Sequence, residues 1–150
     1  MKKLVIFLLV ALIFFTSCQD YGKKVTINKT SEVYYDGVGD TLAKKLGDFL
    51  LKQGYFTTTE ERAVQLLKEN GSYIVKFVVN EERFRQDEET ALIGFKIWQM
   101  WLQDSVFNGG KTKIMLADAT MKDITEVGEL TEVEKQELNE NETITTEIEN

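Results

Sequence analysis

The longest uninterrupted apolar run of the chain lies at its start, and this run limits what the first residues can become. Lys2 and Lys3 precede twelve apolar residues from Leu4 to Phe15. As a helix rising about 1.5 Å per residue, the run is roughly 18 Å long, well short of the roughly 30 Å hydrocarbon core of a bilayer. A stable transmembrane anchor is therefore not expected. Two cations followed by a short apolar segment are instead typical of a secretory signal peptide.

The run ends in Phe15-Thr16-Ser17-Cys18, which contains the single cysteine of the 150 residues. This stretch resembles the lipobox of bacterial lipoproteins, where a bulky apolar residue and two small residues precede the cysteine, although Phe15 stands where leucine is usual. The resemblance implies cleavage before Cys18, a diacylglycerol on its sulfur and an acylated amino terminus carrying fatty acids such as palmitate. The alternative is an ordinary secretory peptide with an unrelated cysteine, which has no partner for an intrachain disulfide.

Lipidation at Cys18 would place the mature protein on a membrane surface of the cell envelope. Each buried CH₂ contributes about 0.8 kcal/mol, so one acyl chain binds marginally and two or three bind almost irreversibly. In enterobacterial lipoproteins, Asp directly after the cysteine retains the protein in the inner membrane. Here Gln19 follows the cysteine and Asp20 comes one residue later. The resemblance therefore favours the outer membrane over the inner membrane.

Negative charge is concentrated at the end of the chain. Residues 126–150 contain nine Glu and one Lys, a net charge of −8, and the remaining 16 acidic and 17 basic residues give residues 1–125 a net charge of +1. The tail spaces its aliphatic side chains singly between like charges, so it is expected to be disordered. The sequence thus predicts a signal peptide (1–17), a lipidated tether (18–24), one α+β domain (25–125) and an acidic tail (126–150).

Composition also excludes several functions. The near-neutral domain with an acidic tail lacks the basic face that a nucleic-acid-binding protein needs. The chain has no histidine and no second cysteine, which removes the usual zinc, haem and thiol chemistries. We therefore expect no metal, no cofactor and no nucleic-acid partner.

The apolar pattern of the domain predicts six elements in the order strand, helix, strand, strand, helix, strand. The first helix runs from Asp40 to Gln53, and Gly54 is the residue type expected just after a helix end. The second helix, of about five turns, runs from Asp87 to Phe107. The predicted strands are Ser31–Tyr35, starting as early as Val25, Ala63–Lys68, Ser72–Asn80 and Lys111–Ala117.

Asn70-Gly71, between the two middle strands, is the strongest short-range signal for a β-hairpin. Alternate residues of the strand that follows share one face: Tyr73, Val75, Phe77 and Val79. The element order predicts a ferredoxin-like split βαβ fold, with one antiparallel sheet and both helices packed on one face. Residues 121–127 add a short strand or extension whose place the pattern does not give.

Parts of the domain are similar to small extracytoplasmic domains of uncharacterised function from bacterial membrane-associated proteins. The similarity covers about residues 33–125 and is carried by packing and turn signals, so it implies no activity. The segments concerned are Ala43-Lys-Lys-Leu-Gly-Asp-Phe-Leu50, Val64-Gln-Leu66, Val106-Phe-Asn-Gly-Gly110 and Lys113-Ile-Met-Leu116.

Catalytic chemistry has few candidate residues in this sequence. One cysteine rules out the copper and iron–sulfur sites that such folds can carry, and hydroxyl nucleophiles lack a histidine to activate them. The remaining candidate is a cluster of carboxylates that could bind a cation or act as acid and base: Glu81, Glu82, Asp87, Glu88 and Glu89. The spacing is not that of a calcium loop, and charge complementing a helix start is the favoured interpretation.

The second predicted helix carries more apolar residues than one core-facing side can use. Leu92, Phe95, Leu102 and Val106 follow helical spacing toward the sheet, with Trp98 at the margin. A second stripe, rotated around the axis, contains Ile93, Ile97, Met100 and Trp101. This stripe is either covered by another part of the chain or a surface for a protein partner or a second copy.

A rival apolar surface is expected on the sheet face that carries no helices. Its residues are Leu67, Ile74, Val78 and Met115, with Tyr34 beside them.

Three functions follow from these observations. The leading hypothesis is a non-catalytic, membrane-tethered interaction module that works with another envelope protein. The second is a cation-dependent envelope enzyme that uses the Glu81–Glu89 carboxylates. The third is a purely structural role in the envelope.

Overall fold

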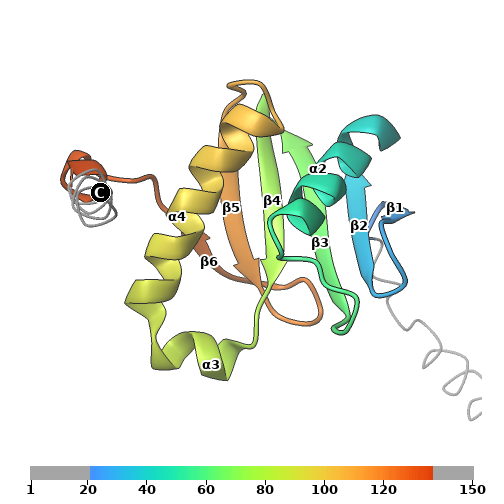
Figure 1. Cartoon of the computed structure of the whole chain (residues 1–150). Helices are drawn as coiled ribbons and strands as arrows, with labels where there is room; N and C mark the ends of the chain where they lie inside the picture. The colour runs from blue at the N-terminus through green and yellow to red at the C-terminus, as the bar shows by residue number, and fades with distance from the viewer. Residues whose placement is uncertain (1–20, 137–150) are drawn as a thin grey trace, which may run out of the picture.

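The computed structural model describes residues 21–136, which form a single sheet covered by helices (Figure 1). The predicted signal peptide, Cys18 and residues 137–150 of the acidic tail lie outside the described residues. The strands are β1 (Lys23–Thr26), β2 (Ser31–Asp36), β3 (Arg62–Glu69), β4 (Ser72–Val78), β5 (Thr112–Ala117) and β6 (Asp123–Val127). The helices with assigned bounds are α2 (Asp40–Lys52), α3 (Glu81–Gln86) and α4 (Glu88–Ser105).

The six strands lie in the sheet in the same order as in the sequence. The pairs β1–β2, β3–β4 and β5–β6 are antiparallel, whereas β2–β3 and β4–β5 are parallel. Each parallel pair is joined by a helix, α2 in the first case and α4 in the second, because a parallel connection has to cross back over the sheet.

Two rows of apolar side chains run across the sheet on the helix-covered face and form the core. The register aligns Val33, Val64, Phe77 and Leu116 in one row, and Tyr35, Leu66, Val75 and Ile114 in the next. All eight side chains are at most 3% exposed. Alternation along each strand therefore separates a fully buried face from a face that no helix covers.

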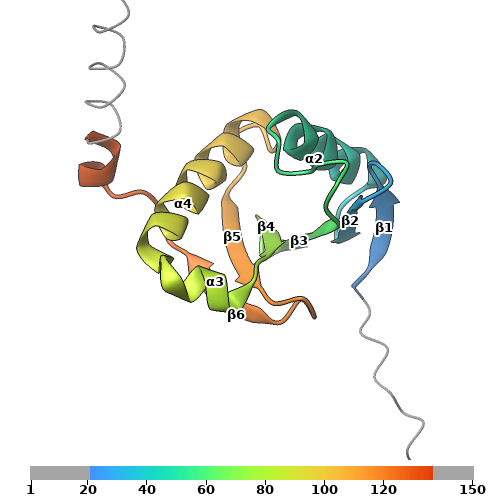
Figure 2. The ribbon, with the colours of Figure 1, turned by 60° about the horizontal axis from the view of Figure 1, so that its bottom comes forward.

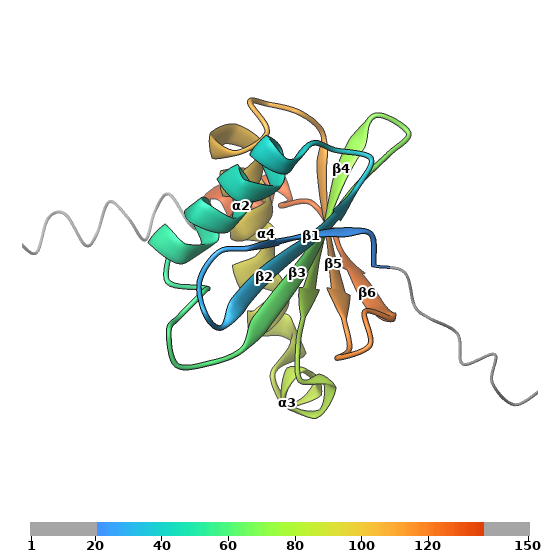
Figure 3. The same ribbon diagram turned by 90° about the vertical axis from the view of Figure 1, so that its right-hand side faces the viewer.

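Both long helices cover the same face of the sheet (Figures 2 and 3). In Figure 1, β2 and β3 point up while β4 and β5 point down, and each helix in front leads to the next strand on the left. The two crossovers therefore have opposite hands. The β4–α4–β5 unit is right-handed, as are about 98% of such connections, and β2–α2–β3 is left-handed. One uncommon crossover is the consequence of keeping both helices on one side of a sequentially ordered sheet.

The structure confirms the α+β class, the order of the six predicted elements and the placement of both predicted helices on one face. The prediction of an antiparallel ferredoxin-like sheet is wrong. In that arrangement a further strand separates the two strands joined by each helix, whereas here β2 pairs directly with β3 and β4 with β5. Hydrophobic periodicity reports which face of a strand is buried, but it does not report which strand lies beside it, so the sequence pattern left this choice open.

The sequence predicted turns and helix ends more accurately than it predicted which strands lie side by side. Asn70 and Gly71 both adopt positive φ in the β3–β4 turn, and Gly54, with φ 76°, directly follows the Gln53 C-cap of α2. Three elements of the structure differ from the predicted ones. The segment from residue 23 forms a separate strand, β1, which pairs with β2. The short helix α3 precedes α4, and residues 123–127 form the edge strand β6.

The chain continues past the expected end of the domain at residue 125. Val127 in β6 is 2% exposed and joins the core, and residues 132–136 are helical. Between residues 21 and 136, no helix combines the length and the hydrophobicity needed to cross a membrane.

Gly47 in α2 is required by close packing and provides a test of this core. A Cβ at this position would overlap the side chain of Ile27, in the turn between β1 and β2, and would press on Val33. We expect Gly47→Ala to lower the free energy of unfolding by about 1–3 kcal/mol through overpacking, although alanine is the better helix former. Urea denaturation of the purified protein measures the change.

Gly94 in α4 is the matched control, since a Cβ there meets nothing within 4 Å. Gly94→Ala should raise the free energy of unfolding by up to about 1 kcal/mol. A Gly47→Ala protein as stable as the Gly94→Ala protein would contradict the described packing of Ile27 on α2.

Candidate functional site

Helix α4 anchors the candidate site because one side of it is built into the core. Leu102 and Val106 are fully buried, and Leu92, Phe95 and Trp98 pack against the core from the same side, as the helical spacing predicted. Gln99 is also buried, at 7% exposed, and its side-chain oxygen accepts a hydrogen bond from the backbone N–H of Ile114 in β5 at 3.2 Å. This contact fixes the rotation of α4 relative to the sheet.

The predicted stripe on α4 remains at the surface among the described residues. Ile93 is 36% exposed, Met100 44% and Trp101 43%, and Ile97 between them is partly buried. Three of the five exposed large apolar side chains of residues 21–136 therefore lie on one side of one helix. No other segment between residues 21 and 136 buries these side chains.

Trp101 is held by the core that its neighbours form. Its ring contacts the ring of Trp98 at a centroid distance of 5.9 Å. Trp98 in turn contacts Phe49 of α2, Tyr55 and Phe77, with centroid distances of 6.1–6.2 Å. The exposed indole is thus the outermost member of a packed aromatic cluster, which limits its freedom before any partner binds.

The start of the predicted tail contacts α4 beside this stripe. Lys96 of α4 forms an ion pair with Glu134 at 2.7 Å, and both side chains are less than one quarter exposed. Glu134 also accepts hydrogen bonds from the backbone N–H of Thr131 at 2.7 Å and from its hydroxyl at 2.9 Å. The Thr131 hydroxyl oxygen in turn accepts one from the backbone N–H of Glu134 at 3.3 Å, which completes a helix capping box. The bond from Lys96, followed by those from Thr131, lowers the pKa of Glu134 to about 2.

The acidic cluster proposed as an alternative site is organised by an arginine. Glu81 lies in the first turn of α3 and Glu88 in the first turn of α4, and Arg85 pairs with both, at 3.5 and 3.1 Å. The side chain of Asn80 caps α3 by accepting a hydrogen bond from the backbone N–H of Arg83. Throughout residues 21–136, no three carboxylate, thiol or imidazole side chains gather closely enough to hold a metal ion.

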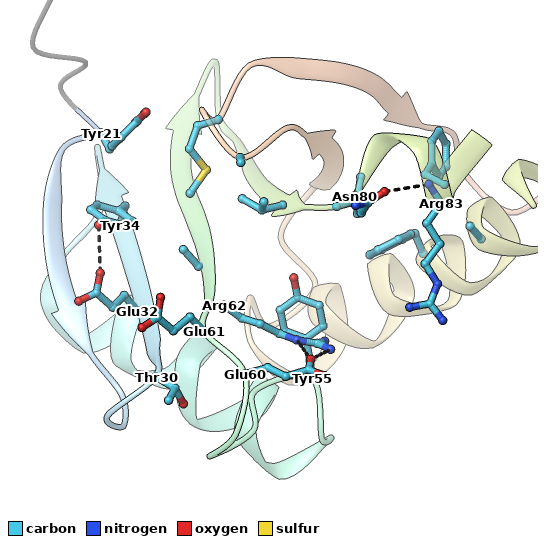
Figure 4. A pocket seen from close by; sticks show the side chains of 18 of the residues that line it. Tyr21, Thr30, Glu32, Tyr34, Tyr55, Glu60, Glu61, Arg62, Asn80 and Arg83 are labelled. Atoms are coloured by element: carbon cyan, nitrogen blue, oxygen red, sulfur yellow. Dashed lines mark hydrogen bonds and ion pairs between the residues drawn. The ribbon is translucent and has the colours of Figure 1, made fainter. Parts of the chain in front are cut away.

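An open hollow of about 1190 Å³ lies at one end of the sheet, between the start of β3, the end of β4 and α3 (Figure 4). Tyr55 points its hydroxyl into it, and the guanidinium of Arg62 lies 5.0 Å from the centre of that ring while pairing with Glu60. Burial raises the pKa of Tyr55 to about 12, against the opposing effect of Arg62. The lining therefore combines a neutral phenol with a guanidinium paired to Glu60, and the carboxylates of Glu61 and Asp87 also border it.

The sheet face away from the helices is partly apolar, as predicted. Leu67, Ile74, Val78, Met115 and Tyr34 all lie on it and are partly buried. Three ion pairs of 2.7–2.8 Å surround them: Lys24–Glu32, Lys76–Asp123 and Lys113–Glu126. The hydrogen bond from Lys24 lowers the pKa of Glu32. The face therefore carries balanced charge, which the sequence pattern did not indicate.

Residue Tyr21, which the sequence placed in a tether, contacts this same face. Gln65 of β3 lies on the face without helices but is only 8% exposed, and its side-chain N–H donates to the carbonyl of Tyr21 at 3.1 Å. The Tyr21 ring packs edge-on against Tyr34, at a centroid distance of 5.6 Å. A glutamine between Val64 and Leu66, on the strand face that alternation directs away from the core, was the one sequence signal that could have indicated this contact.

Fold and site together define a small α+β domain with a mixed sheet and an exposed apolar stripe on one helix. A family model described as AF_1994_N, family N-terminal domain, matches residues 24–129, which run from β1 to just beyond β6. The match covers more than two thirds of the chain, and the chain therefore belongs to this family. No curated protein and no solved structure matches the chain.

The low pKa of Glu134 predicts how acid affects its contact with α4. A carboxyl whose pKa is lowered by folding contributes stability above its ordinary value of 4.5, and this contribution is lost as the pH falls through about 2. We therefore expect the helical turn at residues 132–136 to detach from α4 between about pH 4.5 and pH 2. Carbon-detected NMR titration of the Glu134 carboxyl measures its pKa directly.

Lys96→Met is the control for this titration, because it removes the largest cause of the shift. The pKa of Glu134 should move back toward 4.5 in this variant. A titration near 4.5 in the unaltered protein would show that the ion pair does not form in solution.

Proposed function

We propose that this protein is a lipid-anchored envelope protein that acts as a non-catalytic interaction module, with the stripe on α4 as its contact surface for another protein. The anchor is proposed from Cys18, the only cysteine, at the position where the lipobox requires it. The outer membrane is favoured over the inner one because Gln19, not Asp, follows that cysteine.

The observation that carries this proposal is the exposure of Ile93, Met100 and Trp101 on a helix whose other side is buried. Tryptophan and methionine are enriched at protein interfaces, and aromatic side chains held in place by packing are typical hot spots. The Lys96–Glu134 ion pair beside the stripe provides a polar rim. An exposed stripe of this kind is costly in a monomer unless a partner covers it.

The test places a photo-crosslinking amino acid at Met100 of the full-length protein in its native cells. We expect one discrete crosslinked product, because a specific partner covers this position. Leu51 on α2 is the matched position, since it is 39% exposed and apolar but lies apart from the stripe; a crosslinker there should give no such product.

Ile97→Asn combined with Trp101→Gln should weaken the association by at least about 30-fold, because a hot-spot side chain contributes roughly 2 kcal/mol or more. Leu51→Gln is the control that should leave it unchanged, and circular dichroism confirms that each variant is folded. Equal crosslinking in both variants would reject the stripe as the interface. Sedimentation of the purified protein distinguishes a second copy from a different protein.

The cation-dependent enzyme is the second candidate, and the Glu81–Glu89 carboxylates are its proposed ligands. Against it stands Arg85, which already neutralises Glu81 and Glu88 and would be repelled by a bound cation. We therefore expect a calcium titration to leave the backbone NMR signals of residues 81–89 unchanged at millimolar calcium. Saturable shifts confined to these residues would favour the enzyme and count against a purely binding role.

A further inference from the structure

Three hydrogen-bonding or ring contacts hold the beginning of the domain on the sheet face that carries no helices. The Tyr21 carbonyl accepts the bond from Gln65, its ring packs on Tyr34, and its hydroxyl donates to the carbonyl of Thr120 at 3.1 Å. Thr120 lies in the loop between β5 and β6, so Tyr21 connects one side of the sheet to the other. We call this set of contacts the Tyr21 latch.

Gly22 allows the chain to leave β1 and turn onto this face. Its φ is 84°, and a Cβ at this position would stand 2.5 Å from the carbonyl oxygen of Tyr35. Any other residue would therefore be strained and would collide with the backbone of β2. The latch depends on a glycine at this one position, which indicates that it is a specific feature of the fold.

We propose that the face opposite the helices is the side of the domain that lies against the membrane surface, held there by the Tyr21 latch. This inference rests on the proposed lipidation of Cys18. Only three residue steps separate Cys18 from Tyr21, and they span at most about 11 Å. A cysteine held at the headgroups by its acyl chains therefore keeps Tyr21, and the face on which it lies, close to the lipid.

The paired charges of this face allow contact with lipid headgroups without strong attraction or repulsion. Its lysines at positions 24, 76 and 113 are each paired with a carboxylate on another strand of the sheet. Paired cations gain little of the roughly 1 kcal/mol that a free Lys contributes near an anionic surface. The short tether, and not electrostatic attraction, is then what sets the orientation.

The opposite side of the domain carries the parts that a membrane would obstruct or repel. The stripe on α4 lies on the helix side, and residues 131–136 of the acidic tail lie on that side as well (Figure 3). With the open sheet face toward the lipid, Trp101 faces outward and the carboxylates of Glu132 and Glu134 lie away from anionic headgroups. Both features follow from one orientation.

Energy transfer from the domain to the membrane tests this orientation in the full-length, lipidated protein. Vesicles of phosphatidylethanolamine and phosphatidylglycerol carry an acceptor dye on a fraction of the headgroups. A donor dye is attached to a new cysteine, either Lys113→Cys on the open face or the matched Lys44→Cys on the exposed side of α2. Acylated Cys18 does not react, so each variant has one thiol.

We expect at least a twofold higher transfer efficiency for the label at position 113 than for the label at position 44. Six Gly and Ser residues inserted between Asp20 and Tyr21 should make the two efficiencies equal, because the latch is then no longer close to the anchor. Equal or reversed efficiencies in the protein with its natural tether would overturn the proposal. A difference that survives the insertion would overturn the role of the tether.

Mass spectrometry of the same preparation separates this inference from the function on which it rests. A mature chain that starts at acylated Cys18 and floats with the vesicles supports the anchor. An unmodified cysteine, with no energy transfer at either position, refutes the anchor and the orientation together. An acylated protein in which position 44 lies as close to the lipid as position 113 refutes the orientation only.

Discussion

One-sided packing is the constraint on which the rest of this structure depends. Both α2 and α4 cover the same face of the sheet, so a single core contains the buried rows around Val64 and Leu66. The arrangement requires a left-handed crossover through α2, and it leaves the other sheet face without a helix. It also gives α4 a fixed inner side, and the apolar residues that do not fit there remain on its outer side. The two surfaces considered for function are both products of this choice.

The sequence predicted those features of the fold that depend on neighbouring residues. Asn70-Gly71 gave the hairpin, Gly54 gave the end of α2, and helical spacing separated Leu102 from Trp101. Strand adjacency was predicted wrongly, because the buried faces of β2 and β3 have the same pattern whether the strands pair with each other or are separated by another strand. The short helix α3 was not predicted because only one helix, starting at Asp87, was expected after β4, and six residues are too few for a clear helical pattern of apolar residues. Its cap at Asn80 is evident only in the structure.

The residues of the candidate site could be predicted from the sequence, but their exposure could not. The stripe of Ile93, Ile97, Met100 and Trp101 could be read from spacing, but whether another segment covers it depended on contacts between distant residues. The same limit applies to Tyr21, whose bond to Thr120 joins positions 99 residues apart. Long-range contacts of this kind decide which surfaces are free, and a single sequence carries little information about them.

The edges of the sheet also bear on how this domain can associate. β1 has only four residues and begins with two lysines, and β6 carries acidic side chains and follows an irregular register near Leu116 and Ala117. Short, charged and irregular edge strands are a common protection against strand-to-strand joining. Two such domains brought close together would therefore not extend a shared sheet, and their encounters would be confined to side-chain surfaces.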